Sequence, residues 1–105
     1  MIARIWHGKV PSVKAAAYHE YLLQTGLPDY ANVKGNRGVS LLKKEDAGVT
    51  HYYTLTYWDD TDAIKRFAGE DYEKARYYPE DKDYLLEFEP TVIHYEVLEF
   101  IQPGI

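Results

Sequence analysis

The stretch VTHYYTLTYW, residues 49–58, decides the fold, because it is the longest candidate for a β-strand in the chain. It follows Glu45-Asp46-Ala47-Gly48, four residues typical of a tight turn. A second β-branched and apolar run, residues 39–44, lies on the other side of that turn. The two runs and their short connection therefore predict a β-hairpin in the middle of the chain.

Helix and strand signals alternate on both sides of this hairpin. Gly26 and Gly69 each end a predicted helix, and Pro79 and Pro90 mark breaks in the second half. In chain order, the predicted elements are a strand over residues 2–7, a helix from Pro11-Ser12 to Thr25-Gly26, a connector over 27–34, the hairpin strands 39–44 and 49–58, a helix that starts among residues 59–62 and ends at Gly69, one or two helical turns over 71–78, and a last strand over 91–101.

This order is β-α-β-β-α-β, the ferredoxin-like arrangement of the α+β class. It predicts an antiparallel sheet with the strands in spatial order 4-1-3-2. The chain has 105 residues, so we expect a single domain over residues 1–105.

Composition excludes several classes of function. The net charge of −5 disfavours binding to nucleic acid, and the absence of cysteine excludes disulfides and thiolate metal ligands. No apolar stretch approaches the length of a membrane span, and no signal peptide is recognisable, so we expect a cytoplasmic protein without a membrane partner. The aromatic content is high, with 11 Tyr, 3 Phe and 2 Trp.

The predicted strands carry bulky residues on both faces of the sheet. A sheet with one solvated face alternates apolar and polar residues, whereas residues 51–58 and 92–98 do not. The helices cover one face. A second copy of the chain is the simplest cover for the other, so we expect a homodimer through the sheet face.

Three short motifs resemble the antibiotic biosynthesis monooxygenase-like proteins of the dimeric α/β-barrel group. They are Gly35-Asn36-Arg37-Gly38-Val39, Leu55-Thr56-Tyr57-Trp58-Asp59 and Ala63-Ile64-Lys65-Arg66-Phe67. The resemblance covers most of the chain and implies a homodimer whose two sheets form a barrel, with a pocket between sheet and helices in each subunit. Members of the group include cofactor-independent oxygenases of aromatic phenols, haem-degrading enzymes, and isomerases or decarboxylases.

The chain departs from the haem-degrading branch of that group. That branch has an Asn on the first strand, a Trp in the second helix and a His shortly after it. The corresponding positions here are Trp6, Phe67, and Arg76 or Tyr77. The resemblance therefore implies no haem ligand, and we expect no cofactor.

Three histidines fall at neighbouring ends of predicted strands: His7, His51 and His94. If all three side chains point to one face, they suit zinc or iron. The alternative is three histidines with separate hydrogen-bond partners, and strand register decides between the two.

Opposite charges suggest a register for the first and last strands. Pairing Arg4 with Glu96 places Trp6 beside His94 on the same face. Such a mixture of aromatic, cationic and imidazole groups suits a small-molecule pocket. The alternative is a structural ion pair beside a core tryptophan. The charged segment 70–89 is expected at the surface, except for Arg76 and Tyr77.

These observations and the resemblance lead to one functional hypothesis with alternatives. The hypothesis is a cofactor-independent monooxygenase that acts on a small aromatic, quinol-type molecule. His94 is the candidate base and Arg4 or Arg76 stabilises the oxyanion. The predicted ring-binding residues, which core packing could also explain, are Trp6, Trp58, Phe67 and Tyr77. The alternatives are a small-metabolite isomerase or decarboxylase, and a non-catalytic ligand-binding dimer of the same fold.

Overall fold

The computed structural model describes residues 1–104 and contains one four-stranded antiparallel sheet. The strands lie in the order β2-β3-β1-β4, which confirms the predicted topology. In chain order the elements are β1 (Ile2–Pro11), a 3₁₀ turn (Ser12–Lys14), α1 (Ala15–Gln24), α2 (Gly26–Ala31), β2 (Asn36–Asp46), β3 (Val49–Trp58), α3 (Thr61–Ala68), a second 3₁₀ turn (Pro79–Asp83) and β4 (Ile93–Glu96).

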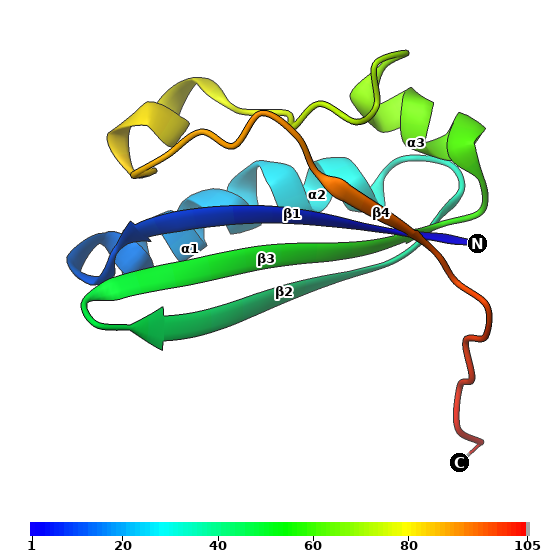
Figure 1. The fold of residues 1–105 in the computed structure, drawn as a ribbon, viewed down its shortest axis with the longest axis horizontal. Helices are drawn as coiled ribbons and strands as arrows, with labels where there is room; N and C mark the ends of the chain where they lie inside the picture. Colours follow the sequence, from blue (N-terminus) through cyan, green and yellow to red (C-terminus); the bar gives the residue numbers. More distant parts are fainter. Residues whose placement is uncertain (105) are drawn as a thin grey trace.

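All the helices lie on one side of the sheet (Figure 1). Along β1 the even-numbered residues from Arg4 to Val10 are buried beneath them, whereas the odd-numbered residues from Ile5 to Lys9 are only partly buried. β3 follows the same alternation, with Trp58 wholly buried. We call these two sides of the sheet the helix face and the open face.

The core between the sheet and the helices has two apolar clusters. One surrounds Trp6, Val10 and Tyr18 and is closed by Leu85 and Val92. The other contains Trp58, Ile64 and Phe67, with Tyr30 and Ala63 against them. Both clusters sit on the helix face, so this side of the sheet both stabilises the fold and forms the candidate site.

α3 begins and ends where its sequence predicts. The Asp60 side chain accepts a hydrogen bond from the Ala63 backbone N–H (2.9 Å), which caps the first turn. Gly69 then adopts a φ of 86°, a conformation that favours glycine, and the helix stops there.

The structure corrects three of the predicted elements. The connector 27–34 contains α2, because Pro28 falls in the first turn, where a missing N–H costs nothing. Residues 71–78 are not helical but form a turn at 71–73 followed by irregular chain. They pair loosely with the chain before β4, through Ala75 N–H to Pro90 O (3.0 Å) and Val92 N–H to Glu73 O (2.9 Å).

The last strand is also shorter than the predicted range 91–101. It pairs with β1 only over Ile93–Glu96, opposite Ile2 to Ile5. The last backbone contact between them is Val97 N–H to Met1 O (2.9 Å). Beyond it the chain leaves the sheet close to the N-terminus (Figure 1).

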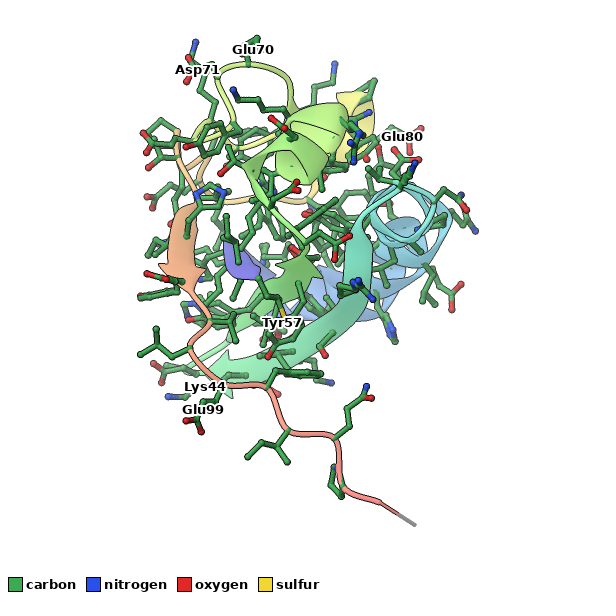
Figure 2. The ribbon with its side chains drawn as sticks, turned by 90° about the vertical axis from the view of Figure 1, so that its right-hand side faces the viewer. Lys44, Tyr57, Glu70, Asp71, Glu80 and Glu99 are labelled. Carbon is green, nitrogen blue, oxygen red and sulfur yellow. The ribbon has the colours of Figure 1, made fainter. Side chains whose placement is uncertain are left out.

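The open face of the sheet is uncovered. Several of its apolar side chains are about half exposed, namely Leu42, Ile93, Tyr95 and Phe100. Figure 2 shows Tyr57 and Lys44 on this side, opposite Glu70 and Asp71 on the helix side. Within residues 1–104, no helix has the length and apolar character needed to cross a membrane.

Candidate functional site

Arg4 is a buried cation on the helix face of β1. Its side chain is 1% exposed, and its guanidinium carbon lies 5.4 Å from the centre of the Phe67 ring. Its Nη2 donates a hydrogen bond to Lys74 O (3.3 Å), and Nε has no partner among the described residues. Burial lowers the pKa of this guanidinium, because the charged form is taken out of water.

A second guanidinium, that of Arg76, packs on the same phenyl ring. Its central carbon lies 4.9 Å from the Phe67 centroid and 5.3 Å from that of Tyr78. Nη1 donates to Phe67 O (3.2 Å), and Nη2 is 3.6 Å from an Asp29 carboxylate oxygen. The Phe67 ring is therefore in contact with two cations, the buried Arg4 and the half-exposed Arg76.

A small cavity lies beside this pair. Its volume is about 20 Å³, enough for one water molecule. The Tyr30 hydroxyl in its wall lies 3.0 Å from Thr54 Oγ1. Burial raises the pKa of this hydroxyl, although Arg4 and Arg76 favour its ionised form. The lining residues are Trp6, Tyr18, Leu22, Gly26, Tyr30, Thr54, Arg76, Tyr78 and Asp81.

Asp81 brings a buried carboxylate to the wall of the cavity. Its Oδ1 accepts a hydrogen bond from the Tyr18 hydroxyl (2.9 Å), and its Oδ2 accepts one from the Tyr78 backbone N–H (2.6 Å). Burial raises the pKa of Asp81, and these two hydrogen bonds oppose the shift. The carboxylate is thus fixed in position by two donors.

His94 lies next to Arg4 but outside the cavity. The two residues are directly paired across β4 and β1, and the Tyr72 ring meets the imidazole edge-on at 5.2 Å. The buried Nε2 has no partner within residues 1–104. Burial lowers the pKa of His94, and the positive charge of Arg4 lowers it further. The imidazole is therefore neutral near physiological pH and able to accept a proton.

The predicted register of β1 and β4 is wrong by two residues. Ile2, rather than Arg4, is opposite Glu96, and Arg4 is opposite His94. A shift of two preserves the face, so these side chains still share the helix face with Trp6, as expected. The predicted Arg4–Glu96 ion pair does not form because Arg4 is buried against Phe67.

The predicted ring-binding residues fall into two groups. Phe67 and Trp58 pack together, with ring centres 5.9 Å apart, and the Trp58 indole N–H donates to Thr56 Oγ1 (2.8 Å). Trp6 and Tyr77 meet edge-on at 6.3 Å on the other side of Arg4. Trp6 lines the cavity, whereas Trp58 supports Phe67 from within the core.

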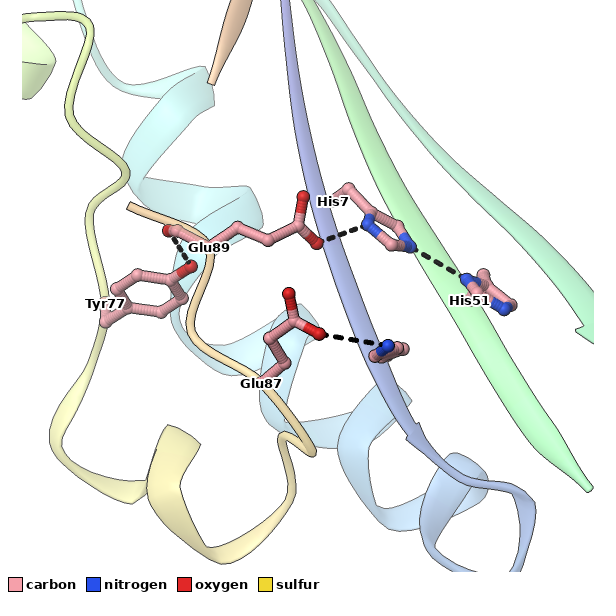
Figure 3. A network of polar contacts seen from close by, with 6 residues as sticks. His7, His51, Tyr77, Glu87 and Glu89 are labelled. Carbon is pink, nitrogen blue, oxygen red and sulfur yellow. Dashed lines mark hydrogen bonds and ion pairs between the residues drawn. The ribbon is translucent and has the colours of Figure 1, made fainter. Parts of the chain in front are cut away.

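Two of the three histidines considered as metal ligands do meet, on the open face. His7 Nε2 lies 2.8 Å from His51 Nδ1, and His7 Nδ1 contacts the Glu89 carboxylate (Figure 3). His94 is excluded from this group because it points to the helix face. Among residues 1–104 no group of three or more side chains is arranged to hold a metal ion, so of the two alternatives left open by the sequence the three-histidine metal site is not formed.

The contact between His7 and Glu89, together with two contacts of Lys9, attaches the segment before β4 to the edge of β1. Lys9 Nζ is 3.0 Å from a Glu87 carboxylate oxygen, and the Leu86 backbone N–H donates to Lys9 O (2.9 Å). Figure 3 shows both carboxylates reaching across to the strand, with the Tyr77 hydroxyl donating to the backbone oxygen of Glu89.

Sequence reasoning missed two residues of the site. Tyr30 fell in a segment predicted to be a connector, and α2 places its ring against Phe67 at 4.5 Å. Asp81 belongs to a charged segment predicted to lie at the surface. The one available signal was Pro79, whose position at the start of a 3₁₀ turn sets the geometry that directs Asp81 inward.

Comparisons with solved structures place this architecture in a known class. A provisionally assigned antibiotic biosynthesis monooxygenase from Nitrosomonas europaea aligns with a TM-score of 0.68 at 16% identity, over 94% of this chain and 100% of its own. A similarly assigned protein from Caulobacter crescentus gives 0.62 at 24% identity, over 93% and 90%. The haem degrader MhuD from Mycobacterium tuberculosis, with two haems bound in its active site, gives 0.65 at 16% identity, over 97% and 100%.

The protein is thus an α+β, ferredoxin-like chain. More particularly, it has the fold of the antibiotic biosynthesis monooxygenase structures, as its sequence motifs suggested. Neither the protein-family models nor the curated protein sequences contain a match. The relationship therefore rests on the three-dimensional arrangement rather than on sequence.

Proposed function

We propose that the protein is a cofactor-independent monooxygenase of a small aromatic, quinol-type molecule. The observation that carries the proposal is the pair of guanidinium groups, Arg4 and Arg76, on the Phe67 ring beside an aromatic-lined cavity. A cation buried as Arg4 is, in surroundings of low dielectric, stabilises a phenolate or enolate far more than water does, and Arg76 adds a second positive charge nearby.

In this proposal, His94 removes the proton from the substrate hydroxyl. Its lowered pKa keeps the imidazole neutral, and its unpartnered Nε2 is available as the acceptor. Arg4, which is directly opposite, then faces the anion that forms. The electron-rich anion reacts with dioxygen. The substrate supplies the electrons, one oxygen atom enters it as a carbonyl, and the other leaves as water.

The aromatic residues hold the substrate ring in this scheme. Phe67, Trp6 and Tyr77 provide faces and edges around Arg4, and Trp58 keeps Phe67 in place from behind. Arg76 is half-exposed at the mouth of the same site, so it can approach the anion from the solvent side.

The haem-degrading branch carries a histidine shortly after the second helix, and this chain has Arg76 and Tyr77 at that position. We therefore propose a reaction that uses no haem.

We further propose that the protein works as a homodimer through the open face of the sheet. The apolar side chains exposed there, Leu42, Ile93 and Tyr95, form the kind of surface that marks an interface. Sedimentation equilibrium tests this part independently of any activity. A dimer that Leu42→Lys dissociates supports it, and a monomer at all concentrations contradicts it.

Oxygen uptake by the metal-stripped protein tests the activity. The panel contains anthrones, naphthohydroquinones and catechols, and we expect uptake above the spontaneous rate with at least one. His94→Ala abolishes this uptake, whereas His19→Ala, which removes an exposed imidazole from α1, leaves it unchanged. Turnover that consumes no oxygen would favour an isomerase or decarboxylase. Binding without turnover would favour a ligand-binding dimer, and either result would reject the oxygenase.

A further inference from the structure

Three buried nitrogen groups without partners lie together on the helix face, and we call this set the row. They are His94 Nε2, Arg4 Nε and Trp6 Nε1, and none has a hydrogen-bond partner among the described residues. Arg4 is directly opposite His94, and Trp6 is the next residue of β1 on the same face. His94 and Trp6 are therefore diagonal neighbours on adjacent strands, and such neighbours lie about 7–8 Å apart, the length of a small aromatic molecule.

Burying these three groups without partners lowers the stability of the folded protein. Arg4 and Trp6 are 1% and 5% exposed, so water does not reach their free N–H groups. A buried donor without an acceptor costs about 1–3 kcal/mol, and a charged one costs more. Of the five N–H donors of Arg4, the one on Nε has no acceptor among the described residues.

The carboxylates nearest to the cavity do not neutralise Arg4. Asp29 accepts from the Tyr78 hydroxyl and lies 3.6 Å from Arg76, and Asp81 is bound by Tyr18 and Tyr78. Among residues 1–104 no carboxylate forms an ion pair with Arg4. The guanidinium thus lacks the planar, bidentate anion for which its shape is suited.

Each member of the row is covered by one aromatic ring from the segment 67–77. Tyr72 meets His94 at 5.2 Å, Phe67 lies 5.4 Å from the Arg4 guanidinium carbon, and Tyr77 meets Trp6 at 6.3 Å. Beyond Ala68, where α3 ends, this segment has no regular secondary structure, and it is joined to residues 90–92 by two backbone hydrogen bonds and the bridge at Lys74. A flat molecule can therefore enter between the row and the rings of Tyr72 and Tyr77 by displacing this short loop.

We propose that the row His94–Arg4–Trp6 binds a planar hydroxyaryl carboxylate, with its carboxylate on Arg4 and Trp6 and its hydroxyl on His94. This inference rests on the proposed function, because it assigns the substrate class for the same site. The order of the groups sets the orientation of the ligand. Two donors, one of them charged, hold the acid, and the neutral imidazole receives the hydroxyl that is to lose its proton.

Calorimetric titration with two matched probes, 6-hydroxy-2-naphthoate and its methyl ester, tests the proposal under anaerobic conditions. The ester keeps the ring and the hydroxyl but loses the charge. We expect the acid to bind about tenfold more tightly or better, the effect of one charge-assisted hydrogen bond. Equal affinities, or no binding of either probe, would overturn the proposal.

Two variants test whether Arg4 and Trp6 cause the preference for the acid over the ester. Arg4→Gln and Trp6→Phe are each expected to weaken binding of the acid by about tenfold and to change that of the ester much less. Arg66→Gln removes an exposed guanidinium from α3 that bonds only Lys34 O, and it should preserve the preference. If Arg4→Gln does not fold, Trp6→Phe carries the same comparison. An acid preference that survives in Trp6→Phe would contradict the assigned orientation.

The outcome is separable from that of the oxygenase proposal. Preferential binding of the acid without oxygen uptake from any compound would reject the activity and retain the row. Oxygen uptake from neutral quinols, combined with equal affinity for acid and ester, would retain the activity and reject the row.

Discussion

Replacing Gly8 by alanine tests how the Trp6 indole is positioned. A Cβ atom on Gly8 would lie 2.4 Å from Trp6 Cη2, 2.9 Å from Trp6 Cζ2 and 3.0 Å from Leu85 Cδ2. Ordinary van der Waals contact starts at 3.4 Å, so the indole has to move by about 1 Å or the strand has to shift. The backbone of Gly8 does not have a positive φ, so the expected effect is steric alone.

The size of the effect follows from two opposing contributions. Overpacking a well-filled core costs about 1–3 kcal/mol, and the loss of glycine's freedom in the unfolded chain returns about 0.4–1 kcal/mol. We therefore expect Gly8→Ala to lower the free energy of unfolding by about 1–2 kcal/mol. For a chain of this size each kcal/mol lowers Tm by about 4–8 °C.

Urea unfolding followed by circular dichroism measures this difference, and Gly38→Ala is the matched control. Gly38 is also in a strand, and its added Cβ would meet only Tyr57 Cδ2, at 3.9 Å. That variant should be neutral or slightly stabilised. If Gly8→Ala is as stable as Gly38→Ala, the indole does not lie over Gly8, and the placement of Trp6 in the site is wrong.

Three further predictions concern polar groups. Tyr18→Phe removes a donor to buried Asp81 and should cost about 1–3 kcal/mol at neutral pH; because the loss affects the ionised carboxylate, urea unfolding should show a smaller cost below about pH 4. His94 has a pKa below its ordinary value, so between the two values the unfolded chain binds more protons and stability falls as pH decreases. His94→Gln should therefore flatten the loss of stability between about pH 7.5 and 5.5, and an unchanged slope would show that His94 is not desolvated. Asp60→Ala removes the cap of α3 and should lower the free energy of unfolding by about 0.5–2 kcal/mol, measured by thermal unfolding. Asp60→Asn keeps an oxygen acceptor and should lose much less stability. If both variants lose the same stability, the cap is not what stabilises the helix.

Local sequence patterns were sufficient to predict the topology of the sheet and which strand residues share a face. Residues 49–58 form β3 with the predicted bounds, and the order of elements permitted the strand order that is observed. Arg4, Trp6 and His94 share a face, as the alternation along the two strands indicated. The register could not be predicted in the same way, because a shift of two residues leaves every side chain on its own face.

Long-range packing accounts for most of what the sequence did not reveal. Asp81 looks like its acidic neighbours in the chain, and only its contacts with Tyr18 and Tyr78, from distant positions, distinguish it. Residues 71–78 carry helix-compatible side chains, but they bond instead to residues 90–92. In both places the interacting residues are far apart in the sequence, so a local pattern cannot predict the contact.

The contacts of Lys9 and His7 with the segment before β4 have a consequence for the solubility of the protein. β4 pairs with β1 only as far as Ile5, which leaves the rest of β1 without a neighbouring strand on the edge opposite β3. Leu86, Glu87 and Glu89 occupy this edge with one backbone hydrogen bond, one ion pair to Lys9 and one carboxylate contact to His7. An unprotected strand edge can recruit other chains into a growing sheet. By covering this edge, the acidic segment protects the protein from aggregation. Shortening the segment would expose unpaired backbone groups of β1 to other chains and favour fibril formation, even if the fold survived.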